Sequence, residues 1–279
     1  MIRTATETRR GELFGVPLDA LTMAEVLDRI DTSIARREPL LMGVVNAAKV
    51  VNMRRDPELR RSVLAADLIV ADGMAVVWAA RLLGLPVPER VPGIDLMERL
   101  LERGNEKGYR VFCLGAKQDV LQAVMNKIRT ENPGVALVGG RDGYYSESDE
   151  PEIAAQIEAA RPDLLFVAMS SPKKEQFLER WAGRMGVPVC HGVGGAFDVL
   201  AGVVRRAPVA WQRLGLEWLY RVLQEPRRMW WRYLITNTIF CAMLTRDLLR
   251  KPGRRQRGAA SATQAQRRRP DPPRLNGHG

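Results

Sequence analysis

The sequence is poor in the residues that hold metals and form disulfides. Its 279 residues include two histidines and three cysteines, and the cysteines at 113, 190 and 241 form no CxxC pair. Neither a disulfide framework nor a zinc site can be read from this pattern, which fits a reducing compartment. Aspartates with DxD spacing are also absent. We therefore expect no metal site and no cofactor.

Long apolar runs are missing as well. Residues 1–15 carry charges but no apolar core, so we expect no signal peptide. After Pro208 the longest stretch without a charged residue, 233–245, has 13 residues, whereas a membrane-spanning helix needs about 20. The sequence therefore predicts no segment that crosses a membrane.

Acidic residues are scarce in the C-terminal quarter, where the basic residues gather. The net charge of +11 divides into −2 for residues 1–204, +6 for 205–250 and +7 for 251–279. Such asymmetry favours an anionic partner, which could be a membrane surface, a nucleic acid or a phosphorylated substrate.

Short apolar runs alternate with helical patterns through the first two hundred residues. This alternation predicts an α/β fold with a parallel sheet that has helices on both faces. The expected strands are 40–45, 68–70, 109–114, 135–138, 164–168 and 187–190. The expected helices are 23–36, 47–53, 57–64, 74–83, 94–106, 120–130, 153–160 and 173–185.

The character of the chain changes after Pro208. We expect a core at 1–208, a helical appendage at 209–250 with two helices parted at Glu225-Pro226, and a disordered basic tail at 251–279. Four of the six tryptophans fall in the appendage, interleaved with arginines. This pattern is typical of a segment that docks on a membrane surface, although the same apolar residues could simply pack on the core.

Asp72 is the first candidate for chemistry. It follows the apolar run 68–70 and precedes a predicted helix, which places it at the carboxyl end of a strand, where open α/β sheets bind ligands. Arg90 follows shortly after. An acid and a cation at one crevice could deprotonate a hydroxyl and hold a leaving phosphate. The alternative is that Asp72 only caps the following helix.

Other candidates lie where further strands end. Gly194 and Gly195 would let the backbone approach a phosphate closely, but GVGGAF is not the GxGxxG dinucleotide motif. Lys173 and Lys174 begin a helix, where they either favour an anion or are simply solvated. His191 ends an apolar strand and is interpreted as a structural histidine.

Together these motifs resemble the WecG/TagA/CpsF glycosyltransferase family over residues 14–232. The matching stretches are NAAKVVN at 46–52, ADG at 71–73, ERVPGID at 89–95, GA at 115–116, DGY at 142–144, SPKKE at 171–175, GVGGAFDVLAG at 192–202, RAP at 206–208, LEWLYR at 216–221 and EPRR at 225–228.

The resemblance implies an inverting enzyme with a Rossmann-like core. It would move N-acetylmannosamine, its uronic acid or a related hexose from a UDP-sugar to an undecaprenyl-diphosphate-linked acceptor. The product would feed bacterial cell-surface polysaccharides. The enzyme would be cytoplasmic and peripheral on the inner face of the anionic cytoplasmic membrane. It could form a homo-oligomer.

The resemblance also implies roles for individual residues. Asp72 corresponds to the family's base, Arg90 to its phosphate-handling arginine, and Arg221 and Arg228 to appendage arginines that stabilise the leaving group. The substrate-binding residues would be Asn46, Gly73, Gly115, Ser171, Pro172, Lys173, Glu175, Gly192, Gly194, Gly195 and Asp198. Two positions depart from the family, with Val44 in place of a threonine and Lys174 in place of a glutamine, so the sugar stays open.

Two other classes remain open at this point. The alternating pattern also suits a nucleotide-dependent oxidoreductase, but GxGxxG and an acid at the usual distance are missing. The arginines of 254–274 suit a nucleic-acid-binding protein, but this rests on charge alone, and we expect no nucleic-acid partner.

Overall fold

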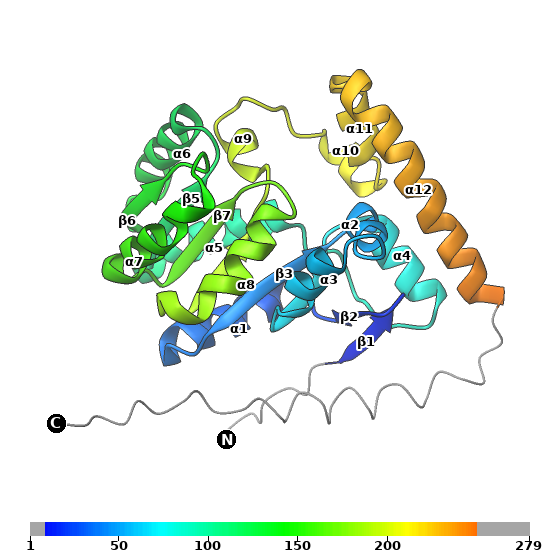
Figure 1. Ribbon diagram of the computed structural model, residues 1–279, viewed down its shortest axis with the longest axis horizontal. Coiled ribbons are helices and arrows are strands. Elements are labelled where there is room, and N and C mark those ends of the chain that lie inside the picture. The colour runs from blue at the N-terminus through cyan, green and yellow to red at the C-terminus, as the bar shows by residue number, and fades with distance from the viewer. Residues whose placement is uncertain (1–8, 250–279) are drawn as a thin grey trace.

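The computed structural model describes residues 9–249 of the chain. In that part the centre is a six-stranded parallel sheet with the order β4-β3-β8-β7-β5-β6 (Figure 1). The strands are β3 (Leu40–Val45), β4 (Leu68–Ala71), β5 (Arg110–Gly115), β6 (Ala136–Arg141), β7 (Leu164–Ala168) and β8 (Val189–Gly192). The predicted α/β class and the parallel sheet are confirmed.

Helices cover both faces of the sheet, as predicted. Strand residues alternate between the faces, so that Val111 and Cys113 of β5 join one buried cluster, whereas Phe112 and Leu114 join another. The first face carries α1 (Met23–Arg36), α5 (Gly93–Lys107), α6 (Gln118–Glu131) and α9 (Ala196–Leu200). The second carries α2 (Ala47–Asn52), α3 (Pro57–Leu64), α4 (Met74–Leu82), α7 (Glu150–Ala160) and α8 (Lys173–Met185), with a 3-10 turn, η1, at Glu147–Asp149.

Local signals explain where several of these helices begin. The hydroxyl of Thr22 accepts from the backbone N–H of Glu25, and the Glu25 carboxylate accepts from the backbone N–H of Thr22, which is a capping box. The Asp56 carboxylate caps α3 by accepting the N–H of Leu59, and Pro57 begins that helix. Such ends are set by neighbouring residues, and they lie where the sequence places them.

The sequence does not predict the antiparallel hairpin of β1 (Arg10–Leu13) and β2 (Val16–Asp19). Its turn, Phe14-Gly15, lies in the left-handed region with φ of 54° and 77°. The buried carboxylate of Asp19 accepts the backbone N–H of Ile69 at 2.7 Å and a guanidinium N–H of Arg10 at 3.1 Å. A hydrogen bond between residues that lie fifty positions apart in the sequence therefore holds the hairpin against β4.

The C-terminal segment folds as α10 (Val209–Arg213), α11 (Glu217–Gln224) and α12 (Pro226–Leu249), so the two predicted helices are present with a short third one before them. The far half of α12 packs on α2 and the hairpin (Figure 1). Phe240 and Met243 are buried in the same cluster as Leu13 and Val16, and the rings of Phe14 and Phe240 meet edge to face at 5.4 Å. This half of α12 thus completes the core, and the tail 251–279 lies outside the described residues.

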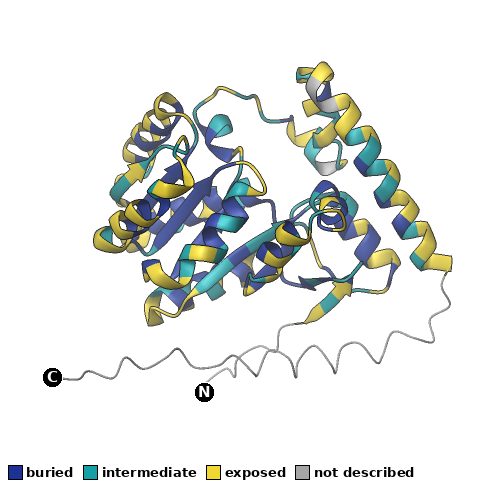
Figure 2. Cartoon of the chain, viewed as in Figure 1, coloured by how far each residue is buried: buried dark blue, intermediate teal, exposed yellow. Residues whose placement is uncertain are grey.

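The near half of α12 begins with an exposed stretch, since every residue of 226–232 whose side chain is described is exposed (Figure 2). The side chains of Trp230 and Trp231 are 58% and 65% exposed. Within residues 9–249 the structure has no helix that is both long and apolar enough to span a membrane.

We predict that Phe240→Ala lowers the free energy of unfolding by about 3 kcal/mol, because it leaves a cavity in the core between α12 and the hairpin. Leu234→Ala on the same helix, at a side chain 44% exposed, should change it by less than about 1 kcal/mol. Urea unfolding measures both. Equal, small effects would show that α12 does not belong to the core.

Candidate functional site

The carboxyl ends of β3 and β4 bring three predicted site residues together. The backbone N–H of Asp72 donates to the carbonyl of Val45 at 2.9 Å, which places Asp72 beside Asn46. A Cβ atom on Gly73 would lie 3.4 Å from Cβ of Asn46. The side-chain oxygen of Asn46 caps α2 by accepting the N–H of Lys49 at 3.0 Å. Asn46, Asp72 and Gly73 therefore converge at one edge of the sheet.

Two hydrogen bonds hold the segment from Arg90 to Gly93 at the end of β4. The N–H of Val91 donates to the carbonyl of Ala71 at 2.7 Å, and the N–H of Gly93 donates to Oδ1 of Asp72 at 3.0 Å. Because Gly93 is the first residue of α5, the Asp72 carboxylate lies at the positive end of that helix. The same hydrogen bond ties the predicted acid to the segment that carries the predicted cation.

Asp72 does not cap the helix that it precedes. The cap of α4 is Gly73, and no side chain bonds to it there. The capping alternative is therefore wrong for α4, and the carboxylate serves the start of α5 instead.

His191 supports this arrangement from beneath. Its buried ring lies with Nε2 3.1 Å from the carbonyl oxygen of Gly93, so Nε2 carries the proton and donates. Burial lowers the pKa of His191 to about 4, which keeps the ring neutral at physiological pH. Its Nδ1 has no hydrogen-bond partner among the described residues. The histidine is structural, as predicted, and it supports the same Gly93 that holds Asp72.

Glu175 lies in a buried cluster with two lysines. Its Oε1 is 2.8 Å from Nζ of both Lys49 and Lys174, and Lys49 also donates to the carbonyl of Val44 at 2.8 Å. Burial opposes ionisation of Glu175, but the two ammonium groups outweigh it and lower the pKa to about 2. Sequence analysis did not single out Lys49, although it lies within the NAAKVVN motif.

Lys174 is buried, and the reading of Lys174 as a solvated lysine is wrong. Burial and the nearby charge of Lys49 lower the pKa of Lys174, whereas Glu175 opposes that shift. A Cβ atom on Gly194 would lie 4.0 Å from Nζ of Lys174. Positive charge therefore lies directly beneath the glycine turn that follows β8, which suits an anion held by that turn.

Lys173 and the residues before it occupy the turn between β7 and α8. Nζ of Lys173 donates to the carbonyls of Gly143 and Tyr145 at 3.0 and 3.1 Å and lies 3.8 Å from the centre of the Tyr145 ring. Lys173 thus ties the loop after β6 to α8. Ser171 and Pro172 are exposed in the turn, and their binding role stays a prediction.

The remaining predicted residues lie at the same edge of the sheet. Gly115 has φ of 123°, and a Cβ there would lie 2.4 Å from the carbonyl oxygen of Ala168, so close packing of β5 on β7 already requires a glycine. Gly192 ends β8, Gly194 and Gly195 lie in the turn that follows, and Asp198 lies in α9. No contact of these residues identifies a ligand, and their binding roles stay predictions.

Arg90 joins the core to the C-terminal helices. Its guanidinium lies 2.8 Å from Oε2 of Glu217, the first residue of α11. Nearby, Gly215 packs so closely on α4 that a Cβ there would lie 2.8 Å from Cβ of Met74. Arg221 is exposed on α11, with no side-chain bond among the described residues. The side chain of Arg228 lies outside the described residues.

Metal ligands do not gather at this edge. Within residues 9–249 no three side chains of His, Cys, Asp or Glu lie close enough to hold an ion together.

Comparison with known proteins identifies a family and a curated relative. The family model of the WecG/TagA/CpsF glycosyl transferases matches residues 11–254, which include the whole sheet and α12. A curated relative, N-acetylglucosaminyldiphosphoundecaprenol N-acetyl-beta-D-mannosaminyltransferase of Bacillus spizizenii, is 36% identical over 182 residues, which are 65% of this chain and 69% of the relative.

We predict that acidification destabilises the fold through His191. The pKa of His191 in the folded chain, about 4, lies below its ordinary value of 6.5, so the unfolded chain takes up the proton first. The free energy of unfolding should therefore fall as the pH drops from 6.5 towards 4, by about 2 kcal/mol between pH 7 and 5.

The matched variant is His191→Gln, which should show a flatter dependence over the same range in chemical denaturation. Glu175 does not contribute to this slope. Its pKa is lowered in the folded chain, so its stabilising contribution is lost only as the pH falls below the ordinary value of 4.5. Identical slopes for the two proteins would show that His191 does not stay neutral in the folded state.

Proposed function

The chain belongs to the WecG/TagA/CpsF family and is a glycosyltransferase, and we propose that its donor is a UDP-sugar and its acceptor a sugar on undecaprenyl diphosphate. The transferred group would be N-acetylmannosamine, its uronic acid or a related hexose. The name of the Bacillus spizizenii relative supports this choice of sugar and acceptor. The observation that carries the proposal is the Asp72 carboxylate, held at the strand end beside the segment of Arg90.

Asp72 is the proposed base. Its Oδ1 is occupied by the N–H of Gly93, whereas Oδ2 makes no hydrogen bond among the described residues. Oδ2 can therefore accept the proton of the acceptor hydroxyl while that oxygen attacks C1 of the donor sugar from the side opposite UDP. A single displacement of this kind inverts the configuration at C1.

The charge that develops on UDP needs donors on the opposite side. Arg90, the backbone N–H groups of the turn Gly192–Gly195 and the buried ammonium of Lys174 beneath it supply positive charge at this edge. Because Arg90 pairs with Glu217, a bound diphosphate would share or replace that partner. Arg221 and Arg228 are proposed to add positive charge from the appendage.

We propose that the exposed half of the appendage docks on the inner face of the cytoplasmic membrane. Trp230 and Trp231 are exposed next to Arg227 and Arg232, and tryptophans and arginines together suit the headgroup layer. Docking there would bring a membrane-linked acceptor close to α11 and Arg90. The family assignment favours this function over an oxidoreductase or a nucleic-acid-binding protein.

Asp72→Asn should lower kcat for UDP release in the presence of acceptor by roughly 100-fold or more, because the amide cannot take the proton. The melting temperature should stay close to that of the wild type. Asp119→Asn, at an exposed acid on α6, serves as the control. Near-normal turnover by Asp72→Asn would show that Asp72 is not the base.

The pair Trp230→Ser/Trp231→Ser should lower binding to anionic liposomes at high salt roughly tenfold or more, since the tryptophans supply the part of the affinity that salt does not screen. Co-sedimentation measures the loss. Leu64→Ser removes an exposed apolar side chain at the end of α3, before β4 and so at the opposite edge of the sheet. If both proteins bind equally, docking does not use this half of α12.

A further inference from the structure

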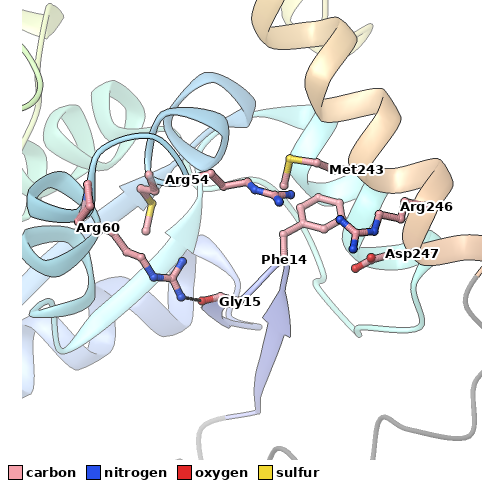
Figure 3. A pocket seen from close by; sticks show the side chains of 9 residues that line it. Phe14, Gly15, Arg54, Arg60, Met243, Arg246 and Asp247 are labelled. Carbon is pink, nitrogen blue, oxygen red and sulfur yellow. Dashed lines mark hydrogen bonds between the residues drawn. The ribbon is translucent and has the colours of Figure 1, made fainter.

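A concave site lies at the far end of α12, apart from Asp72. Its volume is about 550 Å³, and it is bounded by the hairpin turn, the residues from the end of α2 into α3, and the last turns of α12 (Figure 3). We call it the hairpin cleft. Its lining is Phe14, Gly15, Met53, Arg54, Pro57, Arg60, Met243, Arg246 and Asp247. None of these residues belongs to the candidate active site.

The rim of the hairpin cleft is cationic. Figure 3 shows Arg54 and Arg246 extending from opposite walls towards the same space around Phe14. Neither arginine forms an ion pair within residues 9–249, and Asp247 forms none there either. Two guanidinium groups that converge repel each other, and because one carboxylate, Asp247, lies in the same lining, the net charge stays positive. An anion between the arginines would relieve the remaining repulsion.

A third arginine is fixed at the opposite wall. Arg60 donates to the carbonyl of Gly15 at 2.7 Å, and this bond orients its guanidinium and leaves other N–H groups available. The cleft therefore holds three cations against the one acid, Asp247. Planar guanidinium groups bind phosphate oxygens in pairs, so phosphate is the anion that this arrangement suits best.

The floor of the hairpin cleft is apolar. It consists of the partly buried ring of Phe14 and the exposed ring of Pro57, and Met53 and Met243, which are buried, lie behind them. Phe14 adopts a left-handed φ of 54°, which a bulky side chain rarely does, and its ring is held by the edge of Phe240. An apolar floor under a cationic rim suits a ligand with both a phosphate and a hydrocarbon part.

We propose that the hairpin cleft binds the phosphate group of an anionic phospholipid, with the start of its acyl chains on Phe14 and Pro57. Residues 251–279, which come after α12 in the sequence, carry a net charge of +7. The cleft would hold the C-terminal end of α12 at the membrane, and Trp230 and Trp231 would contact the headgroups near its N-terminal end. The proposal does not depend on the chemistry at Asp72.

The test is isothermal titration calorimetry of the full-length protein with dihexanoyl phosphatidic acid below its micelle concentration. Arg54→Ala/Arg246→Ala should weaken binding at least tenfold. The control, Arg36→Ala/Arg129→Ala, removes the same charge from exposed sites on α1 and α6 and should weaken it less than twofold. Equal losses in the two variants would overturn the site, because attraction would then come from net charge alone.

Inorganic phosphate and dihexanoyl phosphatidylcholine identify the source of the anion. The lipid proposal expects inorganic phosphate to bind at least tenfold more weakly than the phosphatidic acid, and the zwitterionic lipid to bind weakly as well. Inorganic phosphate that binds as tightly as the lipid would overturn the lipid assignment in favour of a soluble anion. Thermal melts of all variants verify that the fold is intact.

Discussion

Two hydrogen bonds hold the segment Arg90–Gly93 at the end of β4. They determine where the acid of the site, Asp72, and its cation, Arg90, lie. One runs from Val91 to Ala71, and the other from Gly93 to the carboxylate of Asp72. His191 on β8 holds Gly93 from below. Because three separate segments share this small network, the orientation of Asp72 is fixed by backbone atoms before any substrate arrives, which is the kind of preorganisation that catalysis needs.

The buried cluster of Lys49, Glu175 and Lys174 gives the same edge its charge. Burying three ionised groups is costly, and their attraction offsets that cost only because the geometry is close, with both lysines 2.8 Å from one carboxylate oxygen. The cluster carries a net positive charge under the strand ends. A site built this way favours anionic ligands through its electrostatic field, in addition to any direct contact.

Sequence reasoning located the parts of the fold whose cause is local. The apolar run Leu164–Ala168 became β7, and the capping box at Thr22 began α1, at the predicted residues. The hairpin was missed because its strands are four residues long and depend on a distant contact with Ile69.

For the site, position at a strand end was sufficient to select Asp72, and Asn46 came with the family resemblance. Two features could not be predicted, because they depend on tertiary packing. These are the pairing of Arg90 with Glu217, 127 residues away, and the burial of Lys174. The packing of Phe240 in the core has the same cause.

The configuration of the product tests the central claim most directly, since one base and no covalent intermediate permit only inversion. The measurement is NMR of the disaccharide formed from UDP-N-acetyl-α-mannosamine and a short-chain N-acetylglucosaminyl diphosphate lipid. The account predicts a single new β-linkage. An α-linked product would mean that configuration is retained, and it would contradict direct displacement with Asp72 as the base.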